Sequence, residues 1–184
     1  GKQDPGILDR GYDLVVLSPG VPARIPLVAA ARERGIPVIA EVELAARMAR
    51  GGIIAITGTD GKSTTTSLTG HILNFLGYDA RVGGNIGIPF ISFVDELTDD
   101  SVSVVELSSY QLETIDTFRP DACAIMNITP DHLDRYDGMD SYADAKFRIA
   151  MNQTPADTLV YRAGDPLIAA RLDTVKSRRL SFSP

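Results

Sequence analysis

The sequence predicts an α/β fold, with a mostly parallel sheet and helices on both of its faces. Short apolar segments alternate with segments of helical periodicity along almost all of the 184 residues. Glycine and proline stand between the two kinds of segment, as they do at turns and helix ends. Strands that are joined through helices pair in parallel, and helices then cover both faces of the sheet.

The first fifty residues predict a small α/β unit of their own, Rossmann-like in its alternation of strands and helices. Pro26 in a first helical turn and Gly35 after the last turn bound a helix. Gly51 and Gly52 then mark a hinge, so we predict a division into residues 1–50 and residues 51–184. The elements predicted in the smaller unit are strands at 13–18 and 37–40 and helices at 26–35 and 41–49.

The larger unit begins with a strand at 53–57, a glycine-containing loop and a helix at 62–76. A period of 3.6 residues places a set of apolar side chains on one face of that helix. This set is Leu68, Ile72, Phe75 and Leu76. The other predicted elements are strands at 102–107, 121–127 and 157–161 and helices at 140–152 and 165–172. Neither end of the chain carries an element that closes a sheet, so we expect both ends to be truncated.

The composition argues against several classes of protein. A formal charge of −6 and a pI near 4.9, without a basic stripe, argue against a general nucleic-acid binder. No apolar stretch reaches the length of about 18 residues that a membrane helix needs, and no signal peptide opens the chain. The single cysteine, Cys123, lies in apolar sequence and is expected to be a buried core thiol. We therefore expect a cytoplasmic protein that binds neither nucleic acid nor membrane. We also expect a monomer, although none of these observations bears on the oligomeric state.

Residues 57–64, with the sequence TGTDGKST, are typical of a phosphate-binding loop. Glycines allow backbone N–H groups to turn towards phosphate oxygens, and the amino terminus of the following helix adds a favourable dipole. Ile56 stands where the longer G-x-x-x-x-G-K-[ST] pattern has its first glycine, so the spacing is the shorter G-x-x-G-K-[ST]. No Asn-Lys-x-Asp element for guanine occurs, which makes ATP the expected nucleotide. The expected ATP-binding residues are Gly58, Thr59, Asp60, Gly61, Lys62, Ser63 and Thr64.

Two oxygen-bearing side chains near this loop predict a magnesium ion. Ser63 follows Lys62, which can neutralise the outer phosphates, and its hydroxyl can bind Mg²⁺. Glu106 ends the apolar segment that we expect beside the loop strand in a parallel sheet. Carboxylate oxygens are preferred ligands of this hard cation. The pairing with the loop makes Glu106 a candidate metal ligand.

Lys146 and His132 stand at positions where their residue types are not expected. On a helical wheel Lys146 lies within the apolar face, between Tyr142 and Ala150. It either snorkels, covering the core with its stem, or points into a site where burial lowers its pKa and makes it modifiable. The sequence supports both alternatives equally. His132 follows a predicted strand, where a histidine can ligate a metal, orient a phosphoryl group or cap a turn.

Six segments together resemble the Mur ligases of peptidoglycan synthesis, and most closely those that add D-glutamate. They are, in order, SPGVP, AITGTDGKST, GGNIGIPF, ELSSYQLE, NITPDHLDRY and YADAKFRIA. GGNIG followed by ELSSYQLE is the most specific combination, and the resemblance extends from about residue 12 to residue 170. Asp60 departs from the family, which usually has asparagine there. An extra carboxylate near a triphosphate is unfavourable unless it faces away or towards the metal.

The resemblance implies roles for individual residues. Lys62 would hold the β- and γ-phosphates, while Ser63 and Glu106 ligate one Mg²⁺. His132 and Lys146, the latter as a carbamate formed with CO₂, would ligate a second Mg²⁺. Lys62, His132 and Lys146 would then be the catalytic residues. The residues implied to contact the UDP-muramoyl substrate are Ser18, Pro19, Gly20, Asn85 and Ser108.

The activity implied by the resemblance is ATP-dependent amide ligation. The carboxylate of UDP-N-acetylmuramoyl-L-alanine would attack the γ-phosphate of ATP and form an acyl phosphate, from which the amine of D-glutamate would displace phosphate. The family has three domains. Residues 1–50 would be the end of the UDP-substrate domain and residues 51–184 an incomplete central domain, with the amino-acid-binding domain absent and turnover by this chain alone inefficient. Two alternatives stay open: a non-catalytic nucleotide- or UDP-sugar-binding fragment, and a P-loop phosphotransferase or GTPase.

Overall fold

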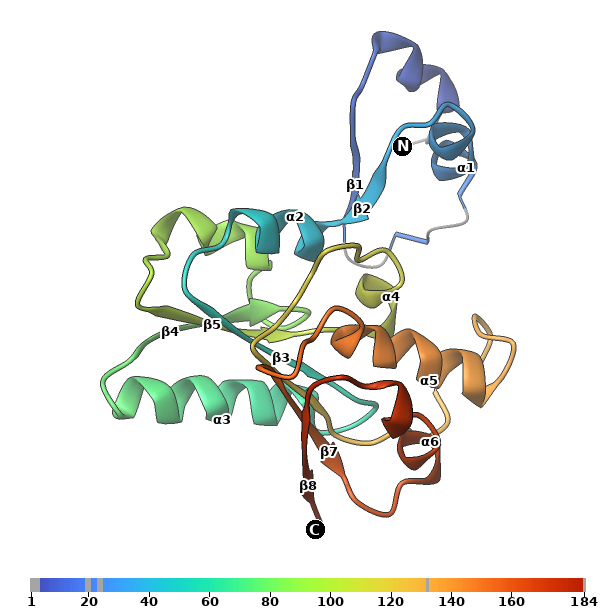
Figure 1. Ribbon diagram of the computed structural model, residues 1–184. Coiled ribbons are helices and arrows are strands. Elements are labelled where there is room, and N and C mark those ends of the chain that lie inside the picture. The colour runs from blue at the N-terminus through green and yellow to red at the C-terminus, as the bar shows by residue number, and fades with distance from the viewer. Residues whose placement is uncertain (1–3, 19–20, 23–24, 132, 184) are drawn as a thin grey trace.

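A six-stranded sheet, parallel throughout, forms the centre of the computed structural model (Figure 1). The structure describes residues 4–18, 21–22, 25–131 and 133–183. The strand order is β4-β5-β3-β6-β7-β8, so the strand that leads into the phosphate loop lies in the interior of the sheet. The strands are β3 (Gly52–Thr57), β4 (Asp79–Gly84), β5 (Ser101–Glu106), β6 (Ala122–Ile125), β7 (Thr158–Arg162) and β8 (Arg178–Phe182). The predicted α/β class is confirmed.

Helices lie on both sides of this sheet, as expected for parallel strands. Helix α3 packs on β4, β5 and β3 from one side, while α2 and the 3₁₀ helix η2 lie on the other side (Figure 1). The α-helices of the larger unit are α3 (Lys62–Phe75), α4 (Ser109–Leu112), α5 (Met139–Phe147) and α6 (Pro166–Ala169). Its 3₁₀ helices are η2 (Phe90–Glu96), η3 (Arg148–Ala150) and η4 (Leu172–Thr174). The predicted helix at 140–152 is thus α5 continued by η3.

A smaller lobe projects from the large sheet, at the top of Figure 1. Its two parallel strands pair Val15 with Val38 and Leu17 with Ala40. Helix α2 connects this lobe to β3 and packs on η2 of the larger unit. The domain boundary at Gly51 and Gly52 stays a prediction. The elements before it are η1 (Pro5–Arg10), β1 (Val15–Leu17), α1 (Pro26–Glu33), β2 (Val38–Ala40) and α2 (Glu41–Met48).

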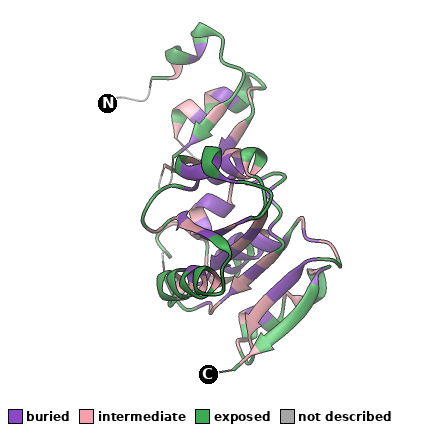
Figure 2. Ribbon diagram, turned by 90° about the vertical axis from the view of Figure 1, so that its left-hand side faces the viewer, coloured by how far each residue is buried: buried purple, intermediate pink, exposed green. Residues whose placement is uncertain are grey.

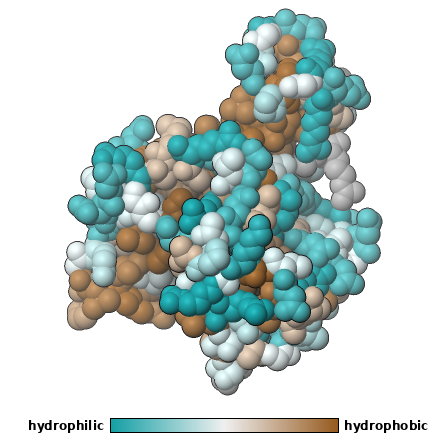
Figure 3. Space-filling view, in the orientation of Figure 1, coloured by the Kyte–Doolittle hydropathy of each residue, from teal (hydrophilic) through white to brown (hydrophobic). Residues whose placement is uncertain are grey.

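The apolar face of α3 points to solvent. The four residues that share this face are all exposed: Leu68, Ile72, Phe75 and Leu76. The helix contacts the sheet through small residues instead, with Thr66 and Gly70 buried. A Cβ atom on Gly70 would overlap Cγ2 of Val82 on β4, so the helix backbone lies directly on the strand. Figure 3 shows the resulting apolar surface as a brown patch at the lower left.

Both edge strands, β4 and β8, are missing from the elements that the sequence predicts. Polar residues interrupt them, and Asp79 and Arg81 on β4 form an ion pair of 3.0 Å on the surface. Strand β8 is exposed along most of its length, which Figure 2 shows in green near the carboxyl terminus. An edge strand buries little and carries charges that discourage further pairing, so it lacks the apolar run of a central strand.

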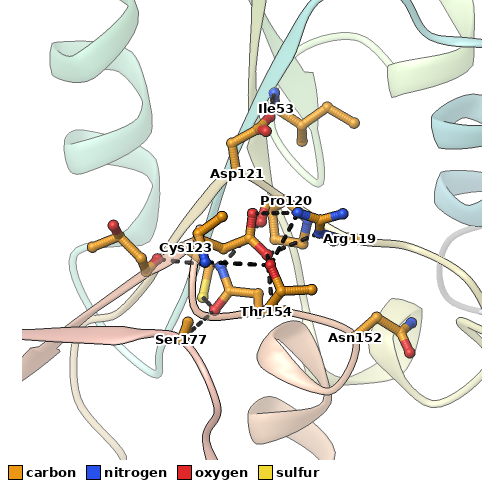
Figure 4. Close-up of polar contacts among 12 residues, drawn as sticks. Ile53, Arg119, Pro120, Asp121, Cys123, Asn152, Thr154 and Ser177 are labelled. Carbon is orange, nitrogen blue, oxygen red and sulfur yellow. Dashed lines mark hydrogen bonds and ion pairs between the residues drawn. The ribbon is translucent and has the colours of Figure 1, made fainter.

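A network of polar contacts joins β6 and β7 at their amino ends (Figure 4). The Gln153 amide donates to the carbonyl of Pro120 at 3.0 Å and accepts from the Ser177 hydroxyl at 2.8 Å. The Cys123 thiol also donates to this amide oxygen, at 3.4 Å. Burial raises the pKa of the Cys123 thiol well above its ordinary value, with the Asp157 carboxylate adding to the shift. The predicted buried core thiol is confirmed.

Glu43 fastens helix α2 to the loop that follows α4. Its carboxylate is fully buried and accepts hydrogen bonds from the backbone N–H groups of Asp116, Thr117 and Phe118 at 2.8–3.0 Å. The Thr117 hydroxyl and Arg47 also donate to it. Burial raises the pKa of this carboxyl, but the hydrogen bonds to the ionised form outweigh burial and bring the pKa down to about 2.

Glu43→Gln is expected to lower the free energy of unfolding by about 3 kcal/mol, because an amide cannot accept from all of these donors. The depressed pKa adds a pH dependence. Glu43 stabilises the fold above its ordinary pKa of 4.5, and this contribution is lost as the pH falls towards 2. Urea denaturation of both proteins between pH 7 and pH 3 tests this. A constant difference between them across that range would contradict it.

None of the helices in the part of the chain that the structure describes is long and apolar enough to span a membrane.

Candidate phosphate and metal site

The candidate site lies where β3, β5 and β6 end at the same edge of the sheet. Strand β3 pairs with both neighbours, with Ile56 opposite Glu106 on one side and Thr57 opposite Ile125 on the other. The loop 58–61 follows β3 directly, so residues after β5 and β6 flank it. This is the edge where open parallel sheets bind ligands.

Two glycines shape the phosphate loop. Gly58 has a φ of 149°, and a Cβ atom there would lie 2.9 Å from Cβ of Met126. Gly61 has a φ of 80° and caps the amino terminus of α3. Left-handed backbone at this cap is available to glycine at little cost. The short loop thereby turns straight into the helix and leaves the first N–H groups of α3 open to an anion.

The loop residues that carry charge lie at the surface of this turn. The Lys62 ammonium donates to the carbonyl of Thr59 at 2.7 Å, which folds the side chain back over the loop. Ser63 and Thr64 are exposed in the first turn of α3. Asp60 is exposed too, and its carboxylate accepts from the Thr129 hydroxyl at 3.2 Å. The unusual carboxylate of this loop is therefore hydrogen-bonded to a neighbouring loop.

Asn127, which follows β6, makes the most contacts with the phosphate loop. Its side-chain oxygen accepts from the N–H groups of Thr59 at 3.1 Å and Asp60 at 2.8 Å. Its side-chain nitrogen donates to the carbonyl of Asp60 at 2.9 Å. The sequence analysis did not single out Asn127. Only its position directly after a neighbouring strand indicates a role, and that position depends on the strand order.

Glu106 places a carboxylate beside the loop. It is 2% exposed, and its Oε1 accepts from the side-chain amide of Asn85 at 2.9 Å. Its Oε2 is buried and has no hydrogen-bond partner among the described residues. The backbone N–H of Asn85 also donates to the carbonyl of Glu106, at 2.9 Å. The predicted metal ligand and the predicted substrate contact therefore lie side by side.

An unpartnered oxygen on a buried carboxylate is costly, and a cation removes that cost. Oε2 of Glu106 therefore fits an Mg²⁺ ion, which prefers oxygen ligands. Among the residues that the structure describes, no three His, Cys, Asp or Glu side chains lie close enough together to hold a metal. A metal at Glu106 would need other oxygen ligands, such as the Ser63 hydroxyl, phosphate oxygens and water.

Ser108 and Gln111 form a second polar pair next to Glu106. They make a capping box at the start of α4, in which the Gln111 side chain accepts from the backbone N–H of Ser108 at 3.0 Å. Gln111 Nε2 is buried and, among the described residues, has no acceptor. The sequence analysis missed Gln111, although the pattern Ser-x-x-Gln is a known start signal of a helix.

Three predicted site residues, Pro19, Gly20 and His132, lie outside the described residues. Ser18 is described and exposed, at the end of the strand β1 in the smaller lobe. The structure therefore brings together the loop 58–61, the first turn of α3, Asn85, Glu106 and Ser108.

Lys146 is buried beneath the phosphate loop. The residue is 2% exposed, and its ammonium donates to the carbonyl of Gly58 at 2.7 Å and lies 4.5 Å from the ring centre of Tyr142. A snorkelling lysine would reach water, so that alternative does not describe this side chain. Burial lowers the pKa of Lys146 to about 7, with the nearby Lys62 ammonium as the second cause and Asp131 and Asp60 opposing.

The low pKa predicts that stability depends on pH. The unfolded chain holds its proton on Lys146 up to about pH 10.5, whereas the folded chain loses it near pH 7, so stability rises with pH in between. Relative to Lys146→Met, which has no charge to bury, the free energy of unfolding should increase by about 3–4 kcal/mol from pH 7 to pH 10. Urea denaturation in CO₂-free buffer measures this. Parallel pH profiles for the two proteins would show that Lys146 titrates normally.

A family model identifies the architecture around this site. The Mur ligase middle domain matches residues 56–184, which is more than half of the chain. The chain belongs to the Mur ligase family. The resemblance expected from the six sequence segments is therefore confirmed, and the match includes the phosphate loop and Glu106.

Sequence relatives of this Mur ligase chain agree in name. A UDP-N-acetylmuramoylalanine–D-glutamate ligase of Koribacter versatilis is 52% identical over 174 residues, which are 95% of this chain and 38% of that protein. A protein of the same name from Syntrophotalea carbinolica is 46% identical over 183 residues, which are 100% of this chain and 40% of the relative. The chain thus spans about two fifths of the length of these curated relatives.

Solved structures of other Mur ligases share the fold at low sequence identity. The UDP-N-acetylmuramate:L-alanyl-γ-D-glutamyl-meso-diaminopimelate ligase from Neisseria meningitides has a TM-score of 0.67 and 17% identity, covering 97% of this chain and 61% of that one. The MurF ligase from Thermotoga maritima in complex with ADP has a TM-score of 0.63 and 16% identity, covering 95% of this chain and 48% of that one. These likenesses concern the fold.

Proposed function

We propose that this chain is part of an ATP-dependent amide ligase that adds D-glutamate to UDP-N-acetylmuramoyl-L-alanine in peptidoglycan synthesis, in the cytoplasm. The observation that carries the proposal is the buried, unpartnered Oε2 of Glu106 beside a phosphate loop. A buried carboxylate oxygen without a hydrogen-bond partner is a favourable ligand for a cation. A cation at this edge of the sheet would in turn bind the phosphates of a nucleoside triphosphate. The names of the sequence relatives supply the substrates of the proposal.

The proposed nucleotide contacts come from the loop and the first turn of α3. Backbone N–H groups at a helix amino terminus bind phosphate, and Lys62 is free to exchange its contact with the carbonyl of Thr59 for phosphate oxygens. Ser63 and Glu106 would hold one Mg²⁺. When bound, the metal offsets negative charge on the phosphates. The described part of the loop thus supplies positioning and positive potential for attack on the γ-phosphate.

The proposed ligands of a second Mg²⁺ are a carbamate on Lys146 and the side chain of His132. CO₂ adds to a neutral amine, whose nitrogen gains a bond to carbon and releases one proton. A pKa of about 7 leaves a large share of Lys146 neutral at physiological pH. The carbamate keeps one N–H, which can still donate to the carbonyl of Gly58. It would also carry one negative charge shared by two oxygens under the loop, and carboxylate-like oxygens are ligands for Mg²⁺.

The UDP-muramoyl substrate is proposed to contact Asn85 and Ser108, with Ser18, Pro19 and Gly20 contributing from the smaller lobe. Asn85 holds Oε1 of Glu106, so a substrate contact there is coupled to the proposed metal ligand. In the proposed reaction the alanyl carboxylate attacks the γ-phosphorus, ADP leaves, and the acyl phosphate forms. The amine of D-glutamate then attacks the acyl carbon, and phosphate leaves.

Phosphate release from Mg-ATP tests the proposed function, with UDP-N-acetylmuramoyl-L-alanine and D-glutamate added separately and together. Release that requires both substrates would establish ligation. Binding of Mg-ATP or the UDP substrate in calorimetry, without release, would mark a binding segment whose catalysis needs further polypeptide. Phosphate release that is independent of both substrates would favour a phosphotransferase over a ligase. An absence of any binding would overturn the proposal.

A further inference from the structure

The phosphate loop of this chain has two residues fewer between its glycines than the long form of the motif. Only Thr59 and Asp60 separate Gly58 from Gly61. In the long form the extra residues allow more backbone N–H groups to curl around the phosphates. A short loop must be held in place by something else, and its N–H groups must be divided between structure and ligand.

Asn127 takes up two of the backbone N–H groups of the loop. Its side-chain oxygen accepts from the N–H groups of Thr59 and Asp60, and its own backbone carbonyl accepts from Thr59 at 3.0 Å. The donor half of the same amide reaches the carbonyl of Asp60 at 2.9 Å. Both peptide N–H groups between the glycines are therefore taken up by Asn127.

The N–H groups that follow are placed differently. The first hydrogen bond of α3 in which the donor lies four residues after the acceptor runs from the N–H of Thr65 to the carbonyl of Gly61 at 3.0 Å. The N–H groups of Lys62, Ser63 and Thr64 precede that bond and have no partner within the helix. They form the open end of the helix dipole, which attracts an anion.

A neighbouring residue strengthens the same attachment. The Thr129 N–H donates to the Thr59 hydroxyl at 3.0 Å, and that hydroxyl donates to the carbonyl of Thr129 at 3.2 Å. The segment after β6 therefore holds the loop by backbone and side chain together. Since β6 is hydrogen-bonded to β3, the loop and its support are fixed to adjacent strands.

We propose that Asn127 is a positioning residue for nucleotide binding, which takes up the N–H groups of Thr59 and Asp60 and leaves those from Gly61 onwards to bind the phosphates. This inference rests on the proposed nucleotide function and deepens it. The sequence predicts ATP contacts from all of residues 58–64. In this proposal residues 58–60 are scaffold, and only residues 61–64 contact the phosphates. An asparagine suits the task because one side chain both accepts and donates.

Amide hydrogen exchange resolved by residue tests the division in the unsubstituted chain, with and without Mg-ATP. Thr59 and Asp60 should exchange slowly in both states, while Lys62, Ser63 and Thr64 should exchange fast and become at least tenfold slower with Mg-ATP. Fast exchange at Thr59 and Asp60 without nucleotide would overturn the proposal. New protection of those two residues by Mg-ATP would overturn it as well.

Asn127→Leu removes the amide without adding charge, and Asn74→Leu is its matched control. Asn74 lies near the carboxyl end of α3, far from the phosphate loop. Its side-chain amide also both donates and accepts, with the backbone of Ala80 at 3.0 and 3.1 Å. Both variants should lower the melting temperature, but only Asn127→Leu should weaken Mg-ATP binding, by at least tenfold in calorimetry. Asn127→Ser serves if the leucine variant does not fold.

Equal affinities of the Asn127 and Asn74 variants would overturn the positioning role. Failure of the unsubstituted chain to bind Mg-ATP would instead overturn the proposed function. In that case the exchange rates of Thr59 and Asp60 without nucleotide still decide whether Asn127 holds the loop.

Discussion

Glu106→Gln is expected to abolish the effect of Mg²⁺ on ATP binding while leaving the fold as stable as before or more stable. Glutamine keeps the size of the side chain and an oxygen to accept from Asn85. It removes the negative charge on a buried oxygen that has no partner among the described residues. Loss of a charged metal ligand should weaken Mg-ATP at least tenfold in calorimetry, whereas affinity for metal-free ATP should change by less than about threefold.

Glu41→Gln is the matched control for this substitution. Glu41 is also buried, with one oxygen accepting from the backbone of Ile91 at 2.7 Å and the other without a partner in the described part of the chain. It lies on α2, away from the phosphate loop, and burial raises its pKa. Glu41→Gln should leave the Mg²⁺ dependence intact. If ATP binding by the Glu106 variant depends on Mg²⁺ as strongly as in the unsubstituted chain, Glu106 is not a metal ligand.

Lys146→Ala is expected to reduce amide ligation by about 10³-fold or more in an active enzyme that carries this chain, because it removes both the proposed metal ligand and the donor to Gly58. Acetate or propionate should restore part of the activity, since a small carboxylate can occupy the space that the side chain leaves. Initial rates at increasing carboxylate concentration measure this. Tenfold rescue or more would show that the missing group is an anion and not an ammonium.

Lys146→Met separates this rescue from a general effect of the added acid. The methionine fills most of the space of the lysine, so carboxylates should not restore its activity. Unchanged ligation by either variant would exclude a carbamate role for Lys146. Rescue of both variants to the same extent would show that the carboxylate acts elsewhere.

The central strands could be predicted because each is a short apolar run, and this holds for β3, β5, β6 and β7. The edge strands could not, because β4 and β8 mix charged and apolar residues. For α3 the periodicity correctly places four apolar residues on one face, but that face lies outside. Periodicity tells which side chains share a face, whereas the contact of Gly70 with Val82 decides which face meets the sheet.

The candidate site was predictable where its residues are adjacent in sequence. The spacing of Gly58, Gly61 and Lys62 belongs to one motif, and Glu106 follows from the rule that parallel strands end at the same edge. Asn127 and Gln111 were missed for other reasons. The contacts of Asn127 depend on β6 lying directly beside β3, which does not follow from local sequence. Gln111 has a local signal, the Ser-x-x-Gln pattern, but the helix that it starts is only four residues long and too short to show a helical period.

The close contact between Gly70 and Val82 links the position of helix α3 to the residue type on β4. The helix touches the strand at its middle, eight positions beyond Lys62 and hence about 12 Å from it along the axis. A larger side chain at position 70 or 82 would force the helix and the strand apart at this contact, and the amino terminus of α3 is expected to shift with the helix. We therefore expect substitutions at Val82, on an edge strand, to alter the proposed nucleotide affinity although Val82 is not among the proposed nucleotide contacts.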